Sequence, residues 1–209
     1  MRKKKDANLS QNKILLAARS EFVKYGFDGA RVDRIATKAK VNKQLIYYYF
    51  KSKDLLFTEV LKLSYQQLRK EEEKINIDNM TAYEAMLNLI VVNWNYYQKN
   101  PDLIFLLSSE NLMRARHVKE HLATFLEINK SWGNLTREII AKGKEDRTIR
   151  DNLDPMQLNI SIAALVIFYI TNGPTLSLLY DTDLASTEEK EKRLQAIKDT
   201  IGEYIAYRA

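Results

Sequence analysis

Three tyrosines stand in succession at positions 47–49, inside the segment VNKQLIYYYFKSKDLL of residues 41–56. Successive side chains on a helix point about 100° apart, so these three rings cannot all face one core. Leu45, Ile46 and Tyr49 share one side of such a helix, and we expect them to pack inward. At least one of the other two tyrosines must therefore present its ring and hydroxyl to something outside.

The opposite side of this predicted helix combines groups that can bind a nucleic acid. One cation, one amide and two phenol hydroxyls lie there: Lys43, Gln44, Tyr47 and Tyr48. Lysine and glutamine can donate to base edges in the major groove, and tyrosine hydroxyls suit phosphate oxygens. Lys53, in the first turn of the next helix, can hold a phosphate together with free backbone N–H groups. In the alternative interpretation, the tyrosines only cover a small three-helix core.

Two short predicted helices position these side chains. Residues 31–39 show the apolar spacing of one helix face, and a further helix begins at Asn42, a common N-cap residue. A tight turn at Lys40-Val41 joins the two helices, which is the spacing of a helix-turn-helix unit. A fourth helix is expected over residues 52–73.

A longer helix is expected before this unit. Ser10 suits its N-cap, Tyr25 its last turn, and Gly26 the position just after the helix. The preceding basic arm, Arg2 to Lys5, lacks apolar anchors and is expected to be disordered in the free protein. It could reach into a DNA minor groove, or it could serve only as a solubilising tail.

Positive charge is concentrated in the first quarter of the chain. Residues 1–53 have a net charge of +10 and residues 54–209 a net charge of −4, which gives +6 for the whole chain. This asymmetry favours a polyanionic partner for the N-terminal part alone. A solvated basic surface without a partner is the alternative.

The glycine at 26, the V-x-x-I-A helix, the turn before YYYF and the KSKDLL segment together form a specific pattern over residues 26–56. This pattern resembles the DNA-binding domain of the TetR family of bacterial transcriptional regulators. The resemblance implies a homodimer that binds DNA through a recognition helix. The family's contact positions correspond here to Lys43, Gln44, Tyr47, Tyr48 and Lys53.

Two positions depart from the family pattern. Lys40 stands where the turn usually has glycine, so a non-glycine residue is expected to take a positive φ there. Ala30 stands where a threonine often caps the second helix, so we expect a missing capping hydrogen bond. Both departures should lower stability without changing the fold.

Helical spacing also dominates the rest of the chain. Capping boxes at 81–84 and 186–189, and an Asp-Pro pair at 154–155, mark three helix starts. The predicted helices lie at about 81–100, 102–113, 118–145 with an interruption near Gly133, 154–179 and 186–207. We expect an all-α protein of about nine helices. Residues 1–53 would form the helix-turn-helix DNA-binding domain with its basic arm, and residues 54–209 a larger helical domain for ligand binding and dimerisation.

The two C-terminal helices support dimerisation independently of the resemblance. Residues 158–170 are apolar on nearly all sides, and such a helix must be buried all round. The last helix has a narrower apolar stripe, and two such helices from each protomer would form a four-helix interface. The predicted interface residues are Leu158, Ile162, Val166, Leu194, Ile197, Ile201 and Tyr204. A monomer with one central helix is the alternative.

An effector pocket is less visible in the sequence. Seven aromatic and polar residues have the mixture that a ligand pocket needs: Trp94, Tyr97, Phe105, Asn111, Arg114, Phe168 and Asn172. Residues of these types are also common in ordinary cores and surfaces. His117 and His121 are four residues apart and could share a metal, but nearby charges favour a solvated helix face. We expect neither a metal nor a cofactor.

Other classes of protein fit the sequence poorly. The longest nearly apolar run, residues 160–170, has 11 residues and is too short to span a bilayer. The chain has no cysteine and no glycine-rich phosphate loop, and it offers no defensible catalytic triad. These features favour a soluble cytoplasmic protein that is not an enzyme.

The leading hypothesis is a sequence-specific repressor that a small-molecule effector releases from a palindromic operator. A DNA-binding regulator without a ligand is the first alternative. A helical enzyme or small-molecule carrier is the second.

Overall fold

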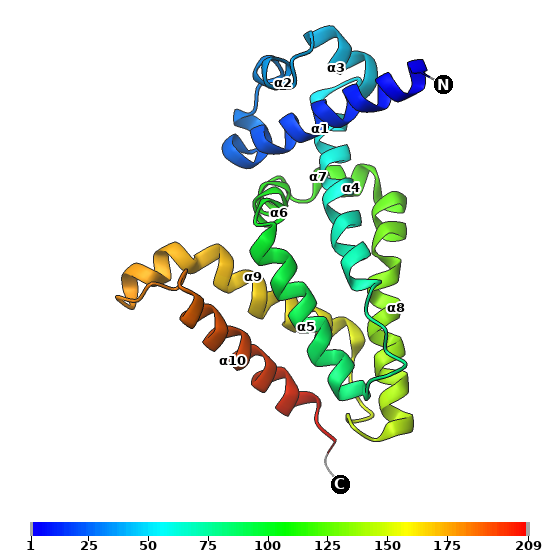
Figure 1. Ribbon diagram of the computed structural model, residues 1–209, viewed down its shortest axis with the longest axis vertical. Coiled ribbons are helices and arrows are strands. Elements are labelled where there is room, and N and C mark those ends of the chain that lie inside the picture. The colour runs from blue at the N-terminus through cyan, green and yellow to red at the C-terminus, as the bar shows by residue number, and fades with distance from the viewer. Residues whose placement is uncertain (1, 208–209) are drawn as a thin grey trace. The chain divides into compact units, whose positions relative to one another are not determined.

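The computed structural model describes the backbone of residues 2–207 and the side chains of residues 8–207. Within this range the regular structure is helical (Figure 1): α1 Arg2–Gly29, α2 Val32–Ala39, α3 Lys43–Phe50, α4 Lys53–Glu72, α5 Ala82–Lys99, α6 Asp102–Leu112, α7 Arg116–Glu120, α8 Leu122–Asp146, α9 Pro155–Leu179 and α10 Thr187–Ile205. The described residues contain no strand, although Ile149 and Ala206 form an isolated bridge. The predicted all-α class is confirmed.

The described chain has ten helices rather than about nine because the stretch predicted at 118–145 is divided. α7 ends at Glu120, and His121 has a non-helical φ of −123°. α8 then continues through Gly133 as helix. The predicted interruption near Gly133 is wrong, and the break lies twelve positions earlier, at His121.

The first helix starts earlier than its sequence suggested. Its backbone is helical from Arg2, so the predicted N-cap at Ser10 is wrong, as is the predicted disorder of the basic arm. Gly26 has φ 65° and ψ −179°, which interrupts the helix where the sequence placed its end. The side chains of residues 2–7 lie outside the described part, so a minor-groove contact by the arm stays a prediction.

Helix contacts divide the described chain into two compact units. The first unit comprises residues 2–66 and 102–126, so α6 and α7 belong with the three N-terminal helices. Phe22, Phe27 and Phe57 form the aromatic centre of its core, with ring centroids 4.9 Å apart for the pair 22/57 and 5.3 Å for the pair 27/57. The predicted functional boundary between residues 53 and 54 is a different division and stays a prediction.

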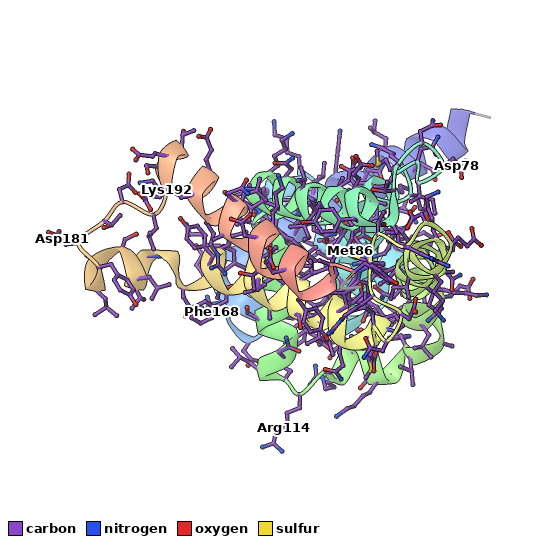
Figure 2. The ribbon with its side chains drawn as sticks, turned by 90° about the horizontal axis from the view of Figure 1, so that it is seen from below. Asp78, Met86, Arg114, Phe168, Asp181 and Lys192 are labelled. Carbon is purple, nitrogen blue, oxygen red and sulfur yellow. The ribbon has the colours of Figure 1, made fainter. Side chains whose placement is uncertain are left out.

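The second unit comprises residues 67–101 and 127–207. In it α5 packs against both α9 and α10, and Figure 1 shows these three helices side by side. Figure 2 shows Met86, which is fully buried, among the helices of this unit. Gly202 allows the close approach of α10 to α5, because a Cβ there would lie 2.5 Å from Tyr83 Oη.

Among the described residues, α9 is one helix that length and composition would allow to cross a membrane. The prediction that no stretch is long enough rested on its 11-residue apolar run. Asn159, Thr171 and Asn172 flank that run without adding charge, so the whole helix stays apolar. The finding is weak evidence for a membrane span, because apolar helices of soluble proteins pass the same test.

Candidate nucleic-acid interface

Helix α3, the predicted recognition helix, is held at its start and on its inner side. The Asn42 side chain accepts a hydrogen bond from the Leu45 N–H at 2.7 Å, as an N-cap does. Ile46 and Phe50 are buried in the core of the first unit. These contacts fix the rotation of α3 about its axis and thereby determine which side chains face outward.

The tyrosine run divides between the two sides of α3. Tyr49 is half-buried and packs against the core, whereas Tyr47 and Tyr48 are 39% and 68% exposed. Gln44 is exposed on the same side as these two rings. Lys51 Nζ lies 5.4 Å from the centroid of the Tyr48 ring, which adds positive charge beside that ring. The outward face that the spacing predicted is therefore present.

The turn before α3 contains a left-handed residue that is not glycine. Lys40 has φ 56° and ψ 45°, as the comparison with the family pattern predicted. Its backbone N–H donates towards the carbonyl oxygens of Ala36 and Thr37, which closes the end of α2. A side chain in this conformation costs about 1 kcal/mol relative to glycine.

The start of α2 lacks a side-chain cap, as expected from Ala30, but a distant carboxylate compensates. Arg31 is the N-cap residue and makes no capping hydrogen bond with its side chain. Glu21 Oε1 accepts the Arg31 backbone N–H at 3.0 Å and the Arg34 Nε–H at 2.6 Å. Glu21 is buried on α1, ten residues away along the chain. No local motif identified it, because the contact depends on how α1 packs beside α2.

Both lysines of the predicted interface have partners within the protein. Lys43 Nζ lies 2.9 Å from Asp33 Oδ1, and this hydrogen-bonded carboxylate raises the pKa of Lys43. Lys53 Nζ donates to the Asp28 carbonyl oxygen at 3.3 Å and lies 4.6 Å from the Phe27 ring centroid. To reach DNA as predicted, each cation would have to leave these partners.

His117 occupies the core of the first unit instead of a solvated helix face. It is fully buried, and its Nδ1 lies 2.7 Å from Glu110 Oε2. Its ring centroid is 4.9 Å from that of Phe27, whose backbone N–H donates to Ser109 Oγ at 3.1 Å. The predicted solvation of His117 is therefore wrong. No group of His, Asp or Glu suited to a metal occurs in the described part of the chain.

The seven predicted effector residues do not lie together in one unit. Phe105, Asn111 and Arg114 belong to the first unit, where all three are exposed. The other four belong to the second unit, where Trp94 and Tyr97 are buried, Asn172 is half-buried and Phe168 is 57% exposed. Their role in effector binding stays a prediction.

The second unit has a cavity of about 470 Å³ beside the end of α5. Its walls include one predicted effector residue, Tyr97, together with Tyr169, Ile170 and Pro174 of α9. Tyr169 Oη donates to the Leu184 carbonyl oxygen at 2.8 Å, which holds the loop between α9 and α10 against this wall. A cavity of this size and lining can hold a small organic molecule.

The predicted dimer residues lie mostly inside the protomer. Leu158, Ile162, Val166, Ile197 and Ile201 are each at most 4% exposed, Leu194 is half-buried, and Tyr204 is 47% exposed. Apolar spacing on a helix that is apolar all round did not show which side its own domain covers. On α9 the exposed apolar side chains are different ones, including Ile160, Phe168 and Leu178.

Comparisons with known proteins agree with this architecture. A family model described as bacterial regulatory proteins of the tetR family matches residues 14–60, and a tetracyclin repressor-like C-terminal domain matches residues 83–201. The HTH-type transcriptional repressor NicS of Pseudomonas putida is 34% identical over 193 residues, which cover 92% of this chain and 91% of NicS. The HTH-type transcriptional regulator RutR of Escherichia coli is 45% identical over 49 residues, 23% of each chain.

Solved structures share the fold. A TetR family transcription regulator from Marinobacter aquaeolei VT8 aligns over 100% of both chains with a TM-score of 0.72 and 15% identity. The fatty acid degradation regulator FadR of Bacillus halodurans aligns over 91% of this chain and 93% of its own, with a TM-score of 0.68 and 17% identity. At these identities the likeness concerns the fold alone.

Proposed function

The chain belongs to the TetR family of bacterial regulatory proteins, and from this premise we propose that it is a transcriptional repressor which a small-molecule effector releases from its operator. The observation that carries the proposal is the outward face of α3, where Tyr47, Tyr48 and Gln44 are exposed. The protein acts in the cytoplasm by binding and without catalysis.

The chemistry of this face suits a major groove. Lys43 and Gln44 can donate to base edges, and the two exposed tyrosine hydroxyls can bind phosphate oxygens and fix the register of the helix. Lys53, at the start of α4, adds a phosphate contact next to free backbone N–H groups. Two such helices in a dimer bind two half-sites about one helical turn apart or a multiple of it, so the operator is palindromic.

Dimerisation is supported by the uncovered side of α9. Ile160 is 52% exposed, Phe168 57% and Leu178 84%. In Figure 2 Phe168 lies on the side of α9 opposite α10. Exposed apolar side chains along one helix are typical of a protein–protein interface, and a second copy of α9 would bury them.

Operator binding by variants of α3 tests the proposal. DNA bound by the protein is first identified by footprinting, and affinity is then measured by fluorescence anisotropy. We expect Lys43→Ala and Tyr48→Ala each to weaken operator binding by about 1–3 kcal/mol. Lys144→Ala is the matched control, because Lys144 is exposed on α8 in the second unit. If a variant that carries both Lys43→Ala and Tyr48→Ala binds the operator as tightly as Lys144→Ala does, α3 is not the recognition helix.

A further inference from the structure

The end of α4 contains a buried ion pair that is incompletely satisfied. Arg69 and Glu72 are 6% and 2% exposed, and Arg69 Nη1 lies 2.6 Å from Glu72 Oε2. Among the described residues Glu72 Oε1 and Arg69 Nε have no hydrogen-bond partner. A carboxylate oxygen that is removed from water and left unpaired costs free energy, so Glu72 retains an unused capacity to accept a donor.

Glu72 also forms part of the wall of a cavity of about 290 Å³ between the end of α4 and α8. Two further carboxylates, Glu73 and Glu138, line the same cavity, and its lining contains no lysine or arginine. Ser131 and Asn134 add polar groups, while Ile75 and Leu135 add apolar surface. The lining therefore attracts positive charge and also offers contacts for a carbon skeleton.

A metal ion does not fit this arrangement. No group of three acidic or histidine side chains in the described part of the chain is placed to hold one. The carboxylates are instead distributed around a space large enough for a small organic molecule. An anion would meet three acidic side chains there and no cation on the wall.

We propose that this cavity binds a small organic cation, an amine or a guanidinium compound, with Glu72 as its principal charge partner. Glu72 Oε1 is buried from water. Binding therefore requires that the carboxyl group of Glu72 turn towards the cavity that this residue lines. Glu73 and Glu138 add attraction from the same lining, and the carbon skeleton contacts Ile75 and Leu135.

This inference deepens the proposed function by naming the class of the effector, and it rests on that function. Glu72 is the last residue of α4, and Lys53, a predicted phosphate contact, is the first. A ligand that moves Glu72 therefore acts on the helix that also begins beside the DNA-contacting face. Coupling between the two ends is the form of control that a ligand-released repressor requires.

Isothermal titration calorimetry with agmatine and putrescine tests the binding site directly, and benzoate serves as the anionic control. We expect at least one of the two cations to bind and benzoate not to bind. Glu72→Gln should weaken the binding by about 10- to 100-fold, which is the loss expected for a hydrogen bond to a charged group. Glu71→Gln is the matched control, because Glu71 precedes Glu72 on α4 and pairs with Lys74 outside the cavity.

Glu138→Gln provides a second variant in case Glu72→Gln folds poorly, since Glu138 is exposed on α8. It should weaken the cation several-fold with an unchanged melting temperature. Failure of both cations to bind the wild-type protein would overturn the proposal. Equal affinity of Glu72→Gln and Glu71→Gln would overturn it as well.

Operator release is measured separately with the same cations. Binding at Glu72 that lowers operator affinity supports the effector assignment, and binding that leaves operator affinity unchanged overturns it. A wild-type protein that binds no operator without ligand would instead contradict the proposed repressor function. The two failures are therefore distinguishable.

Discussion

Lys43 Nζ lies 2.9 Å from Asp33 Oδ1, so a cation of the proposed DNA-binding face is held by a carboxylate from the preceding helix. Asp33 lies in the first turn of α2, and its side chain is 72% exposed. Its negative charge lies beside the surface that a phosphate backbone must approach. If this face binds DNA as proposed, the pair should weaken binding in two ways, by occupying Lys43 and by repelling phosphate.

We expect Asp33→Asn to tighten operator binding several-fold at low salt, because one charge at this range contributes about 1 kcal/mol in a largely aqueous setting. The gain should shrink as salt screens the charge. Fluorescence anisotropy at two salt concentrations measures both effects. Asp78→Asn is the matched control, since Asp78 is an exposed acid in the second unit that Figure 2 shows on a surface loop. Unchanged or weaker binding by Asp33→Asn would contradict this account.

Glu21→Ala should destabilise the protein by about 1–3 kcal/mol, because it leaves the Arg31 N–H and the Arg34 Nε–H without their acceptor. The free energy of unfolding from urea denaturation measures the loss. Glu59→Ala is the control. Glu59 forms a partly buried ion pair with Lys62 on α4, and this pair should contribute at most about 1 kcal/mol to the free energy of unfolding. Equal losses in the two variants would show that Glu21 does not act as the cap of α2.

The helix-turn-helix was largely predictable because its determinants are local. Asn42 caps α3 within three residues, and the inward and outward tyrosines follow from helical spacing. The positive φ of Lys40 was predicted from the family pattern, which usually has glycine at this position. The capping role of Glu21 and the burial of His117 were not predicted, because their partners, Arg31 and Glu110, meet them only through packing.

The features of residues 54–209 were less predictable, because they also depend on packing between distant parts of the chain. A helix that is apolar all round does not indicate which side its own domain covers, so Ile162 and Val166 were assigned to a partner although they are buried in the protomer. Effector residues chosen by type alone, such as Phe105 and Trp94, lie in different units. The cavity at Glu72 has no sequence motif, because α8 and the end of α4 are far apart in the chain.

The stability of the protein should depend on pH through Glu72. Burial raises the pKa of Glu72 from 4.5 to about 7, although Arg69 and Asn93 lower it and Glu73 raises it further. Between these values the folded chain retains a proton that the unfolded chain has lost, so this group makes stability fall as the pH rises from about 4.5 to about 7.

Urea denaturation at pH 5 and pH 7 measures this contribution. We expect wild-type protein to lose about 1–3 kcal/mol more than Glu72→Gln between the two values, because glutamine cannot titrate. Other groups titrate in both proteins and cancel in the difference. Identical pH dependence of the two proteins would show that Glu72 has an ordinary pKa.

The same titration should affect the proposed cation site. Ionised Glu72 attracts a cation and protonated Glu72 does not, so agmatine binding should tighten as the pH rises through about 7. Glu73 and Glu138 line the same cavity, and Arg69 pairs with Glu72. Calorimetry at pH 6 and pH 8 is the measurement, and binding that weakens at pH 8 would contradict the role of Glu72.

The proposed dimer is best tested on the exposed side of α9. Phe168 is 57% exposed in the protomer, so the protomer should still fold when Phe168→Glu places a charge there. Its melting temperature should fall only by the part that dimerisation contributes. In the dimer the charge would be removed from water without a partner, which costs several kcal/mol. Sedimentation should therefore show monomer at micromolar concentration.

Operator affinity should collapse in the same variant although α3 is unchanged, because two DNA-binding domains act as one binder only while they are joined.

Ile201→Glu is an informative contrast. Ile201 is 3% exposed within the protomer, so that substitution should unfold the second unit instead of yielding a folded monomer. Circular dichroism distinguishes the two outcomes. If Phe168→Glu stays dimeric and binds its operator normally, α9 does not form the interface through this side. If the wild-type protein sediments as a monomer both free and on DNA, the two-headed mechanism itself is wrong.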